Sequence, residues 1–433
     1  MTGERFGSTP PDRVQKARGG KAGQLSGQGC YMTFTDLGLK APLVSRLTGL
    51  GMSKPTPIQA KAIPHALQGR DVLGIAQTGT GKTAAFGLPL VIAMSADTAR
   101  PAPRGVRGLV LAPTRELATQ IVATLQALSG DLRISLVVGG KSINVQIKQL
   151  ARGTDILVAT PGRLIDLIDR RAVDLGQTRF LVLDEADQML DIGFVHALRR
   201  IAPLLGKQRQ TMMFSATMPK QIAALARDYL SDPVRVEVSP PGRAAEKVAQ
   251  SVHFVAKDQK QALLIDLLDG HRDDRALVFA RTKHGAERLM KQLERAGFAA
   301  ASIHGNKSQG QRDRALAAFR DGTVRVLVAT DVAARGIDIP GVGHVYNFDL
   351  PNVPENYVHR IGRTARAGRD GRAVAFCTSD EMGELRAIEK VLGARVEIAG
   401  GTPWTSAREA AKTPAKRRPR RRPGRRPAKK MAA

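Results

Sequence analysis

The sequence has few cysteines, few aromatic residues and no long apolar run. Its two cysteines, Cys30 and Cys377, cannot build a disulfide framework, which is typical of a reducing compartment. The eight histidines show no CxxC or HxxxH spacing, so no zinc site is expected. The longest uncharged apolar-rich stretch, Thr83 to Ala96, is too short to span a bilayer, and the N-terminus lacks an apolar signal core. These absences predict a cytoplasmic protein that does not contact membranes.

Acidic residues are also scarce, with 39 Asp and Glu against 67 Lys and Arg, which leaves a formal net charge of +28. Such an excess favours a polyanionic partner, most simply nucleic acid. Twelve basic residues and one acid lie between Arg408 and Lys430, so this stretch carries +11 and the remaining residues carry +17. The C-terminal tail and the body of the chain are therefore both expected to attract a polyanion.

The length of 433 residues suggests two or three domains, and a hydrophobic share of 42% excludes a wholly disordered chain. Short apolar runs without alternation, followed by amphipathic helical stretches, predict parallel strands buried between two layers of helices. Two such series fill residues 34–238 and 249–400, and a Pro- and Gly-containing linker at 239–248 joins them. Residues 1–33 and the basic tail 401–433 are expected to be disordered, with Met32 an alternative start of the chain. The predicted fold class is α/β.

The two series also resemble each other, since the sequence GLVLAPTRELA in the first is similar to RALVFARTKHGAE in the second. This similarity favours two copies of one architecture. The predicted strands are 71–76, 108–112, 134–138, 156–159, 180–183 and 212–214 in the first series, and 276–280, 325–329, 342–348 and 373–377 in the second.

Residues 76–83, with the sequence AQTGTGKT, follow a predicted strand and precede an apolar helical stretch. That position is typical of a phosphate-binding loop, in which glycines let backbone N–H groups turn toward phosphate. Lys82 would reach the β- and γ-phosphates, and Thr83 would help to hold Mg²⁺. Because Ala76 replaces the usual first glycine, a plain Gly-rich turn is the alternative. The other residues expected to touch the nucleotide here are Gln77, Thr78, Gly79, Thr80 and Gly81.

Asp184 and Glu185 follow the predicted strand 180–183. An aspartate in that position can hold Mg²⁺, and the adjacent glutamate can orient and deprotonate an attacking water. The alternative is that both carboxylates merely cap the next helix. The occurrence of the loop and the acidic pair in order within one α/β half favours the catalytic interpretation.

The sequence DEAD, which runs from Asp184 to Asp187, resembles the signature of the DEAD-box RNA helicases. Further motifs of that family follow in the family's order over residues 34–400, and the resemblance is strongest to the bacterial RhlE-type members. It implies two tandem RecA-like domains, an ATPase stimulated by RNA, and ATP with Mg²⁺ as ligands.

The resemblance also implies roles for residues around the nucleotide. The sequence GMSKPTPIQ, which ends at Gln59, resembles the family's Q motif, in which Gln59 would recognise the adenine edge and Phe34 would stack on the ring. Ser215-Ala-Thr217 resembles the motif that couples hydrolysis to strand separation through hydrogen bonds to Asp187. Without the resemblance, a helix-surface amide and a local hydroxyl cap are the alternatives.

The sequence HRIGRTAR in the second half resembles the family's arginine-finger motif. Arg363 and Arg366 would thus reach the γ-phosphate that the first domain binds. Ala365 stands where the family usually has glycine, which affects the expected geometry of the loop. Asp338 matches the residue expected near the ATP ribose. For Arg360, contact with the RNA backbone is a competing interpretation.

A further set of residues matches the family's RNA-contacting motifs and lies at predicted strand ends, where open α/β sheets bind ligands. Hydroxyls, backbone N–H groups and arginines suit contacts with phosphate and sugar, which hold a strand without reading its sequence. Contacts with the 2′-hydroxyl could select RNA over DNA, and with only 17 aromatic residues base stacking is expected to contribute little. The residues are Pro113, Thr114, Arg115, Gly139, Gly140, Thr160 and Arg163 in the first half, and Gln309, Arg312 and Thr330 in the second.

The predicted function is an ATP-dependent RNA helicase, a monomer that separates short duplexes locally and binds RNA without sequence preference. Two alternatives stay open: an RNA chaperone that anneals strands through the basic tail, and a helicase directed to DNA. Protein partners from ribosome assembly or RNA decay are expected.

Overall fold

The computed structural model describes residues 32–77, 79–97, 99–238, 248–334, 341–365 and 370–404. Most of the predicted N-terminal extension, linker and basic tail therefore lies outside the described residues. So do Thr78, Asp338 and Arg366, three residues to which the sequence assigns a role in nucleotide binding or hydrolysis.

The first domain is built on a sheet of seven strands, all parallel, in the spatial order β3-β4-β2-β5-β6-β1-β7. Its strands are β1 (Val72–Ile75), β2 (Val106–Leu111), β3 (Ile134–Val137), β4 (Thr154–Ala159), β5 (Phe180–Leu183), β6 (Gln210–Ser215) and β7 (Val234–Glu237). Its helices are α1 (Ala41–Gly49), α2 (Pro57–Leu67), α3 (Lys82–Ala96), α4 (Arg115–Leu128), α5 (Ile143–Leu150), α6 (Pro161–Asp169), α7 (Ala186–Asp191), α8 (Val195–Ile201), η1 (Ala202–Leu204) and α9 (Lys220–Tyr229).

Both faces of this sheet are covered, because successive residues of a strand point to opposite sides. In β5, Val182 packs into the cluster formed with α2, α3 and α4, whereas its neighbours Leu181 and Leu183 pack into the cluster formed with α6, α8 and α9. Burial on both sides explains why β1 and β5 are continuous apolar runs without a polar face, and why β2 is one apart from the buried Arg107.

The second domain repeats this plan with seven parallel strands in the order β10-β11-β9-β12-β13-β8-β14. Its strands are β8 (Val248–Phe254), β9 (Arg275–Phe279), β10 (Ala300–Ile303), β11 (Val326–Ala329), β12 (Val342–Asn347), β13 (Gly371–Cys377) and β14 (Glu397–Gly400). Its helices are α10 (Lys260–Asp269), α11 (Lys283–Arg295), α12 (Gln309–Asp321), α13 (Asp331–Ala334), α14 (Pro354–Ile361), η3 (Ser379–Glu381) and α15 (Met382–Leu392).

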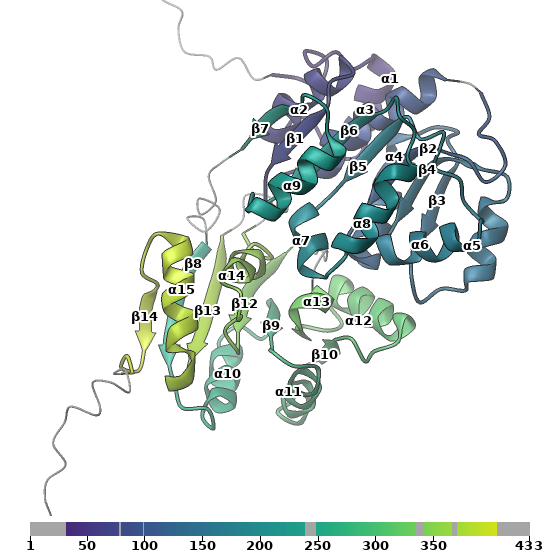
Figure 1. The fold of residues 1–433 in the computed structure, drawn as a ribbon. Coiled ribbons are helices and arrows are strands. Elements are labelled where there is room, and N and C mark those ends of the chain that lie inside the picture. The colour runs from purple at the N-terminus through teal and green to yellow at the C-terminus, as the bar shows by residue number, and fades with distance from the viewer. Residues whose placement is uncertain are drawn as a thin grey trace, which may run out of the picture.

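The two sheets have the same strand order once seven is subtracted from each label of the second sheet. Figure 1 shows the two domains side by side, with α12 and α13 of the second on the side that faces the first. The predicted fold class, two tandem α/β domains of one architecture, is therefore confirmed.

Four strands, β7, β8, β10 and β14, are absent from the strands predicted above. Edge strands β7 and β14 carry mostly exposed and half-buried residues, with Val236 of β7 buried, so they lack the apolar run that marks the central strands. Strand β8 begins at Val248, inside the segment predicted as linker. Trp404, inside the predicted tail, packs against the core of the second domain and donates from its Nε1 to the Cys377 carbonyl at 3.2 Å.

Among the helices that the structure describes, none is long and apolar enough to cross a bilayer.

Candidate functional site

The loop between β1 and α3 has the geometry of a phosphate-binding loop. Gly79 and Gly81 have φ angles of 84° and 90°, a conformation that side chains with a Cβ rarely adopt. A Cβ on Gly81 would also lie 2.5 Å from Gln59 Nε2, so the position has no room for one. The Thr80 hydroxyl donates to the Gln77 carbonyl at 2.8 Å, which closes the turn. The loop leads directly into the N-terminus of α3, where backbone N–H groups can bind an anion.

Gln59 lies against this loop. Its Nε2 donates to the Gly81 carbonyl at 3.0 Å, and its Oε1 accepts from the Thr56 backbone N–H at 3.0 Å. The residue thus ties the start of α2 to the phosphate-binding loop. Phe34, predicted to stack on a base, is 2% exposed and belongs to the apolar cluster of the first domain.

Lys82 and Asp184 face each other at the base of the loop, with Nζ and Oδ1 3.8 Å apart and both side chains buried. The Nζ atom of Lys82 is buried and has no hydrogen-bond partner among the residues that the structure describes. A buried ammonium without hydrogen bonds is costly, so this arrangement suits a bound anion such as phosphate. Thr83 follows on the first turn of α3, half-buried, within the same element.

The acidic pair lies at the C-terminal end of β5. The pKa of Asp184 is raised to about 6, chiefly by burial and also by the neighbouring Glu185, whereas Lys82 acts to lower it. Glu185 is buried and adopts a left-handed backbone with φ 51°, which is unusual for a residue other than glycine. Strained backbone of this kind clusters at functional sites. Oxygen donors of Asp184 and Thr83 suit a hard cation such as Mg²⁺.

Asp187 connects this acidic turn with the end of β6. Its Oδ2 accepts from the backbone N–H groups of Ala216 and Thr217, each at 3.0 Å, and from the Thr217 hydroxyl at 3.2 Å. The Ser215 hydroxyl donates instead to the Thr217 carbonyl at 2.7 Å. The structure therefore brings together the residues of the predicted coupling motif, with Thr217 as the direct partner of Asp187.

The arginine-bearing segment of the second domain lies close to the acidic turn of the first. Gln188 Nε2 and His359 Nδ1 are 3.4 Å apart across the two domains. Arg363 is buried, and its Nε donates to the His359 carbonyl at 3.2 Å. Ala365, at the position where the resemblance implies glycine, has a φ of 55° and so adopts the left-handed conformation.

Three of the predicted RNA-contacting residues meet at the boundary between the domains. Arg115 Nη1 donates to Gln309 Oε1 at 3.0 Å, and Arg312 Nη2 lies 2.9 Å from a carboxylate oxygen of Glu116. Gln309 Nε2 also donates to Glu116 Oε1 at 3.2 Å. In this conformation Arg115, Gln309 and Arg312 therefore bind the opposite domain.

Glu116 is a residue that sequence reasoning missed, although it stands within the quoted PTREL motif. Its side chain is buried and contacts both Gln309 and Arg312 of the other domain. An acid at the second position of a helix usually complements the helix dipole, and that ordinary role concealed this one.

The remaining predicted RNA-contacting residues lie at the ends of first-domain strands and at the end of β11. Thr114 caps α4 by accepting from the Leu117 N–H at 3.2 Å. Arg163 Nη1 donates to the Lys141 carbonyl at 2.9 Å. Pro113 and Thr160 are buried, and Thr330 follows directly after β11. The Arg115 guanidinium lies over Gly139 and Gly140, where an added side chain would collide with it.

Arg360 does not lie on a nucleic-acid surface. Its side chain is buried, its Nη2 donates to Asp331 Oδ2 at 2.8 Å, and its Nη1 donates to Asn347 Oδ1 at 3.0 Å. Contact with the RNA backbone, the competing interpretation for this residue, is therefore excluded in this conformation. Arg360 instead ties α13 to β12 and α14.

The chain matches two family models, DEAD/DEAH box helicase over residues 56–225 and helicase conserved C-terminal domain over residues 259–368. It is 44% identical to the DEAD-box ATP-dependent RNA helicase CshA of Bacillus subtilis over 361 residues, which are 83% of this chain and 72% of that protein. It is 42% identical to CshA of Listeria monocytogenes over 376 residues, or 86% of this chain and 71% of that one.

Two solved structures share the fold. Dbp5 of Saccharomyces cerevisiae bound to RNA and ADP BeF3 matches with a TM-score of 0.74 and 31% identity over 85% of this chain and 95% of that chain. Mss116p bound to ssRNA and AMP-PNP matches with a TM-score of 0.78 and 28% identity over 88% of this chain and 81% of that chain.

Two sheets of identical strand order, with a phosphate-binding loop on one and an arginine-bearing segment on the other, define a two-domain motor protein of the RecA type. Within that class, the chain belongs to the DEAD-box ATP-dependent RNA helicases.

Proposed function

We propose that this chain is an RNA-stimulated ATPase that uses ATP to separate short RNA duplexes locally. The observation that carries the proposal is the buried Lys82 ammonium, which faces Asp184 at 3.8 Å and has no hydrogen-bond partner in the described part of the chain. Both CshA relatives are named as ATP-dependent RNA helicases, and the Dbp5 and Mss116p structures contain RNA and a nucleotide.

Lys82 would bind the β- and γ-phosphates of ATP through its ammonium. Thr83 and Asp184 would hold Mg²⁺, which when bound neutralises charge on the phosphate oxygens. Glu185 would orient the attacking water and accept its proton. Arg363 and Arg366 would stabilise the charge that develops at the γ-phosphate, an effect of roughly 10³- to 10⁵-fold on rate in other enzymes of this chemistry.

Gln59 and Asp338 would bind the base and the ribose, whereas Phe34 would first have to leave the apolar cluster of the first domain to stack on the base. An amide can donate to and accept from the adenine edge at once, which would favour ATP over GTP. Since the Gln59 amide already bonds the Gly81 carbonyl and the Thr56 N–H, base recognition by Gln59 would also adjust the phosphate-binding loop.

Coupling between hydrolysis and strand separation would pass through Asp187 and Thr217, since their hydrogen bonds join the acidic turn to the end of β6. ATP and single-stranded RNA would each stabilise the closed pair of domains. If both ligands favour one state, each must tighten the binding of the other. Hydrolysis and phosphate release would then reopen the pair.

RNA would run along the strand ends that carry Thr160, Arg163 and Thr330, with Arg115, Gln309 and Arg312 at the domain boundary. These groups contact phosphate and sugar, so binding would not depend on the base sequence.

The test measures steady-state ATPase activity with matched RNA and DNA strands, together with ATP affinity with and without RNA. We expect RNA to raise the ATPase rate and the ATP affinity, and DNA to do so much less. Stimulation by DNA equal to that by RNA would favour the DNA-directed alternative. No effect of RNA on either quantity would contradict the coupling.

An RNA chaperone is the second candidate, and the +11 charge of residues 408–430 favours it. Deleting residues 408–433 distinguishes the two. If ATP-dependent unwinding survives and only RNA affinity or annealing falls, the two domains are the motor and the tail is a tether. Each lost single-strand phosphate contact should reduce the slope of log K against log[salt] by about 0.7. An unchanged slope would mean that the tail binds another partner.

We also propose a subgroup, an oligomeric state, a location and protein partners for this chain. The resemblance to RhlE-type members remains a proposal, as the relatives described above are named CshA. A monomeric state, a cytoplasmic location and protein partners from ribosome assembly or RNA decay are proposed on the sequence alone. Sedimentation of the purified chain with and without RNA would test the monomeric state.

A further inference from the structure

The second domain contains a cavity of about 640 Å³ at the N-terminal ends of β9, β12 and β13. The loop between α10 and β9 lines it with His271 and Asp274, and β12 lines it with His344. These three residues take no part in the proposed ATPase mechanism. Their potential ligand atoms all lie within 4.8 Å of one another.

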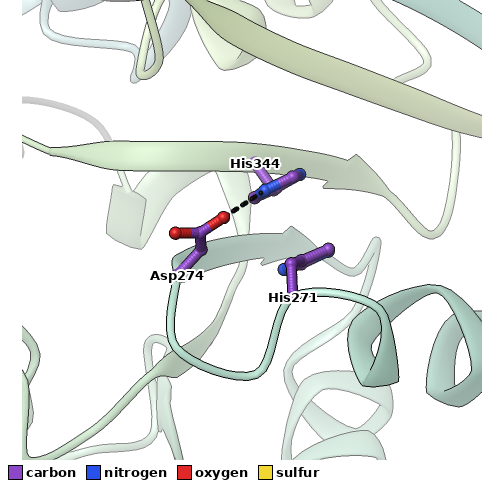
Figure 2. Close-up of side chains that lie close together, drawn as sticks. All are labelled: His271, Asp274 and His344. Carbon is purple, nitrogen blue, oxygen red and sulfur yellow. Dashed lines mark hydrogen bonds and ion pairs between the residues drawn. The ribbon is translucent and has the colours of Figure 1, made fainter.

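Figure 2 shows the two imidazole rings lying one over the other, with Asp274 beside His344. The ring centroids are 3.5 Å apart and the planes differ by 3°. Each ring presents two nitrogen atoms, and an imidazole nitrogen with a lone pair can bind a metal.

The hydrogen bonds of His271 leave one of its nitrogens available. Its Nε2 shares a hydrogen bond with the Tyr346 hydroxyl at 2.6 Å, while its Nδ1 is buried and finds no hydrogen-bond partner among the described residues. In metal sites, one ring nitrogen of a histidine usually bonds a partner that fixes the ring, and the other nitrogen binds the metal. In the tautomer in which Nε2 donates to the Tyr346 hydroxyl, Nδ1 carries a lone pair that can bind a ligand in the cavity.

His344 and Asp274 already lie at a distance that a metal could bridge. His344 Nε2 and Asp274 Oδ2 are 3.0 Å apart. In a four-coordinate site with bonds of about 2.0–2.2 Å, two ligand atoms lie about 3.3–3.6 Å apart, so an ion can replace the shared proton after a small movement. His271 must tilt out of the stack to approach as closely, and it lies in a loop beside an open cavity.

We propose that His271, Asp274 and His344 bind a divalent transition-metal ion, with Zn²⁺ the best match, in the cavity of the second domain. Two imidazoles and one carboxylate suit Zn²⁺, with water as the fourth ligand, and do not suit Mg²⁺ or Ca²⁺, which prefer oxygen. The bound ion would join the α10–β9 loop to β12. The two histidines are far apart in the sequence, which explains why motif spacing predicted no zinc site.

The charges around the cavity permit such an ion. Among the described residues that line the cavity, Arg372 and Arg363 are cations and Asp274 and Asp370 are anions, so these four charges cancel before an ion enters. The side chain of Asp274 is 59% exposed, which places one ligand where an ion can reach it from solvent.

The experiment uses the full chain without an added histidine tag, freed of metal by a chelator. Zn²⁺ binding is measured by calorimetry in excess Mg²⁺, which occupies sites made of oxygen ligands. Co²⁺ is added as a spectroscopic probe, because its visible absorption reports four-coordinate nitrogen and oxygen ligands. We expect one Zn²⁺ per chain, displacement of Co²⁺ by Zn²⁺, and a rise in the melting temperature on binding.

Three variants locate the site. His271→Ala and Asp274→Asn should abolish the tight binding and the Zn²⁺-dependent shift in melting temperature. Asp274→Asn changes an exposed side chain, so its folding without metal should match that of the wild type. Tyr346→Phe, which removes only the hydroxyl next to His271, should weaken binding about 10- to 100-fold.

His284→Ala is the matched control, because His284 is an exposed histidine on α11 of the same domain. Its Zn²⁺ affinity should equal that of the wild type. Unchanged affinity in both His271→Ala and Asp274→Asn would overturn the proposal, as would a wild-type chain that binds no Zn²⁺ under these conditions.

Discussion

Arg312 and Glu116 form an ion pair at 2.9 Å although they belong to different domains. Both side chains are largely buried, and Gln309 donates to the same carboxylate at 3.2 Å. The pair fixes how α12 of the second domain meets the start of α4 in the first. Removing one member of a largely buried ion pair is costly, because the remaining charge loses its partner.

Glu116→Gln should weaken domain closure and lower RNA-stimulated ATPase activity. Nucleotide binding to the phosphate-binding loop of the first domain should stay intact. A double-mutant cycle with Arg312→Ala should give a coupling free energy of roughly 0.5–3 kcal/mol, measured from kcat/KM for RNA. Glu294→Gln, an exposed change on α11, is the control and should have no effect. Additive effects of the two changes would show that the pair does not contribute to closure.

Glu185→Gln should reduce ATP hydrolysis by roughly 10²- to 10⁴-fold, the usual contribution of a positioned general base. ATP and RNA binding should be retained, since Lys82 and the loop are untouched, so the variant should remain on RNA. Turnover is measured by phosphate release and retention by RNA dissociation. A Lys82→Ala chain is the contrast, because it should lose ATP binding itself. Near-normal turnover in Glu185→Gln would remove Glu185 from the proposed role.

Gly81→Ala should impair the phosphate-binding loop. The position has a φ of 90°, and the new Cβ would lie 2.5 Å from Gln59 Nε2. The left-handed backbone alone costs a residue with a Cβ roughly 1–2 kcal/mol. We expect a lower melting temperature and weaker binding of a fluorescent ATP analogue. Gly383→Ala in α15, where no atom lies within 4 Å of the added Cβ, should instead stabilise the chain by about 0.5–1 kcal/mol. Equal behaviour of the two variants would contradict the strain argument.

Ala365→Gly should stabilise the second domain, because Ala365 adopts a φ of 55° that glycine tolerates without cost. The expected gain is about 1 kcal/mol, or roughly 2–4 °C in the melting temperature for a domain of this size. Ala317→Gly, at an exposed position of α12, should have the opposite sign and cost about 1 kcal/mol. Thermal unfolding of both variants tests the prediction, and a destabilised Ala365→Gly chain would contradict it.

Cys377 should react slowly with thiol reagents in the folded chain. Burial, aided by Glu381, raises the pKa of its thiol to about 12, and Trp404 donates to its carbonyl. Near pH 8 the reactive thiolate is therefore scarce in the folded state and becomes more abundant only as the pH approaches the raised pKa. In a Cys30→Ser chain, which leaves one cysteine, labelling should be slow when folded and complete in denaturant. Rapid labelling of the folded chain at pH 8 would contradict the predicted burial.

Much of the architecture could be predicted because it depends on neighbours in the chain. The buried strands of the sheet centre were found from their apolar runs, whereas the half-exposed edge strands β7 and β14 were not. The loop at residues 76–83 was recognisable because it needs glycines at positions with positive φ angles. The preference of glycine for such angles is a property of the single residue. The acidic turn that begins at Asp184 was placed correctly after β5 for the same local reason.

By itself, the sequence determined the two α/β domains, the phosphate-binding loop and the order of the motifs, since hydrophobic period and turn chemistry act over a few residues. Only the tertiary structure decided which distant side chains meet: Arg312 with Glu116, Arg360 with Asp331, and His271 with His344. These partners come together because strand order in the sheets brings together residues far apart in the chain, and no local pattern encodes that order. The scarce cysteines and acids limited the class of protein, but only burial in the folded domain showed that a charge such as that of Arg360 serves the fold.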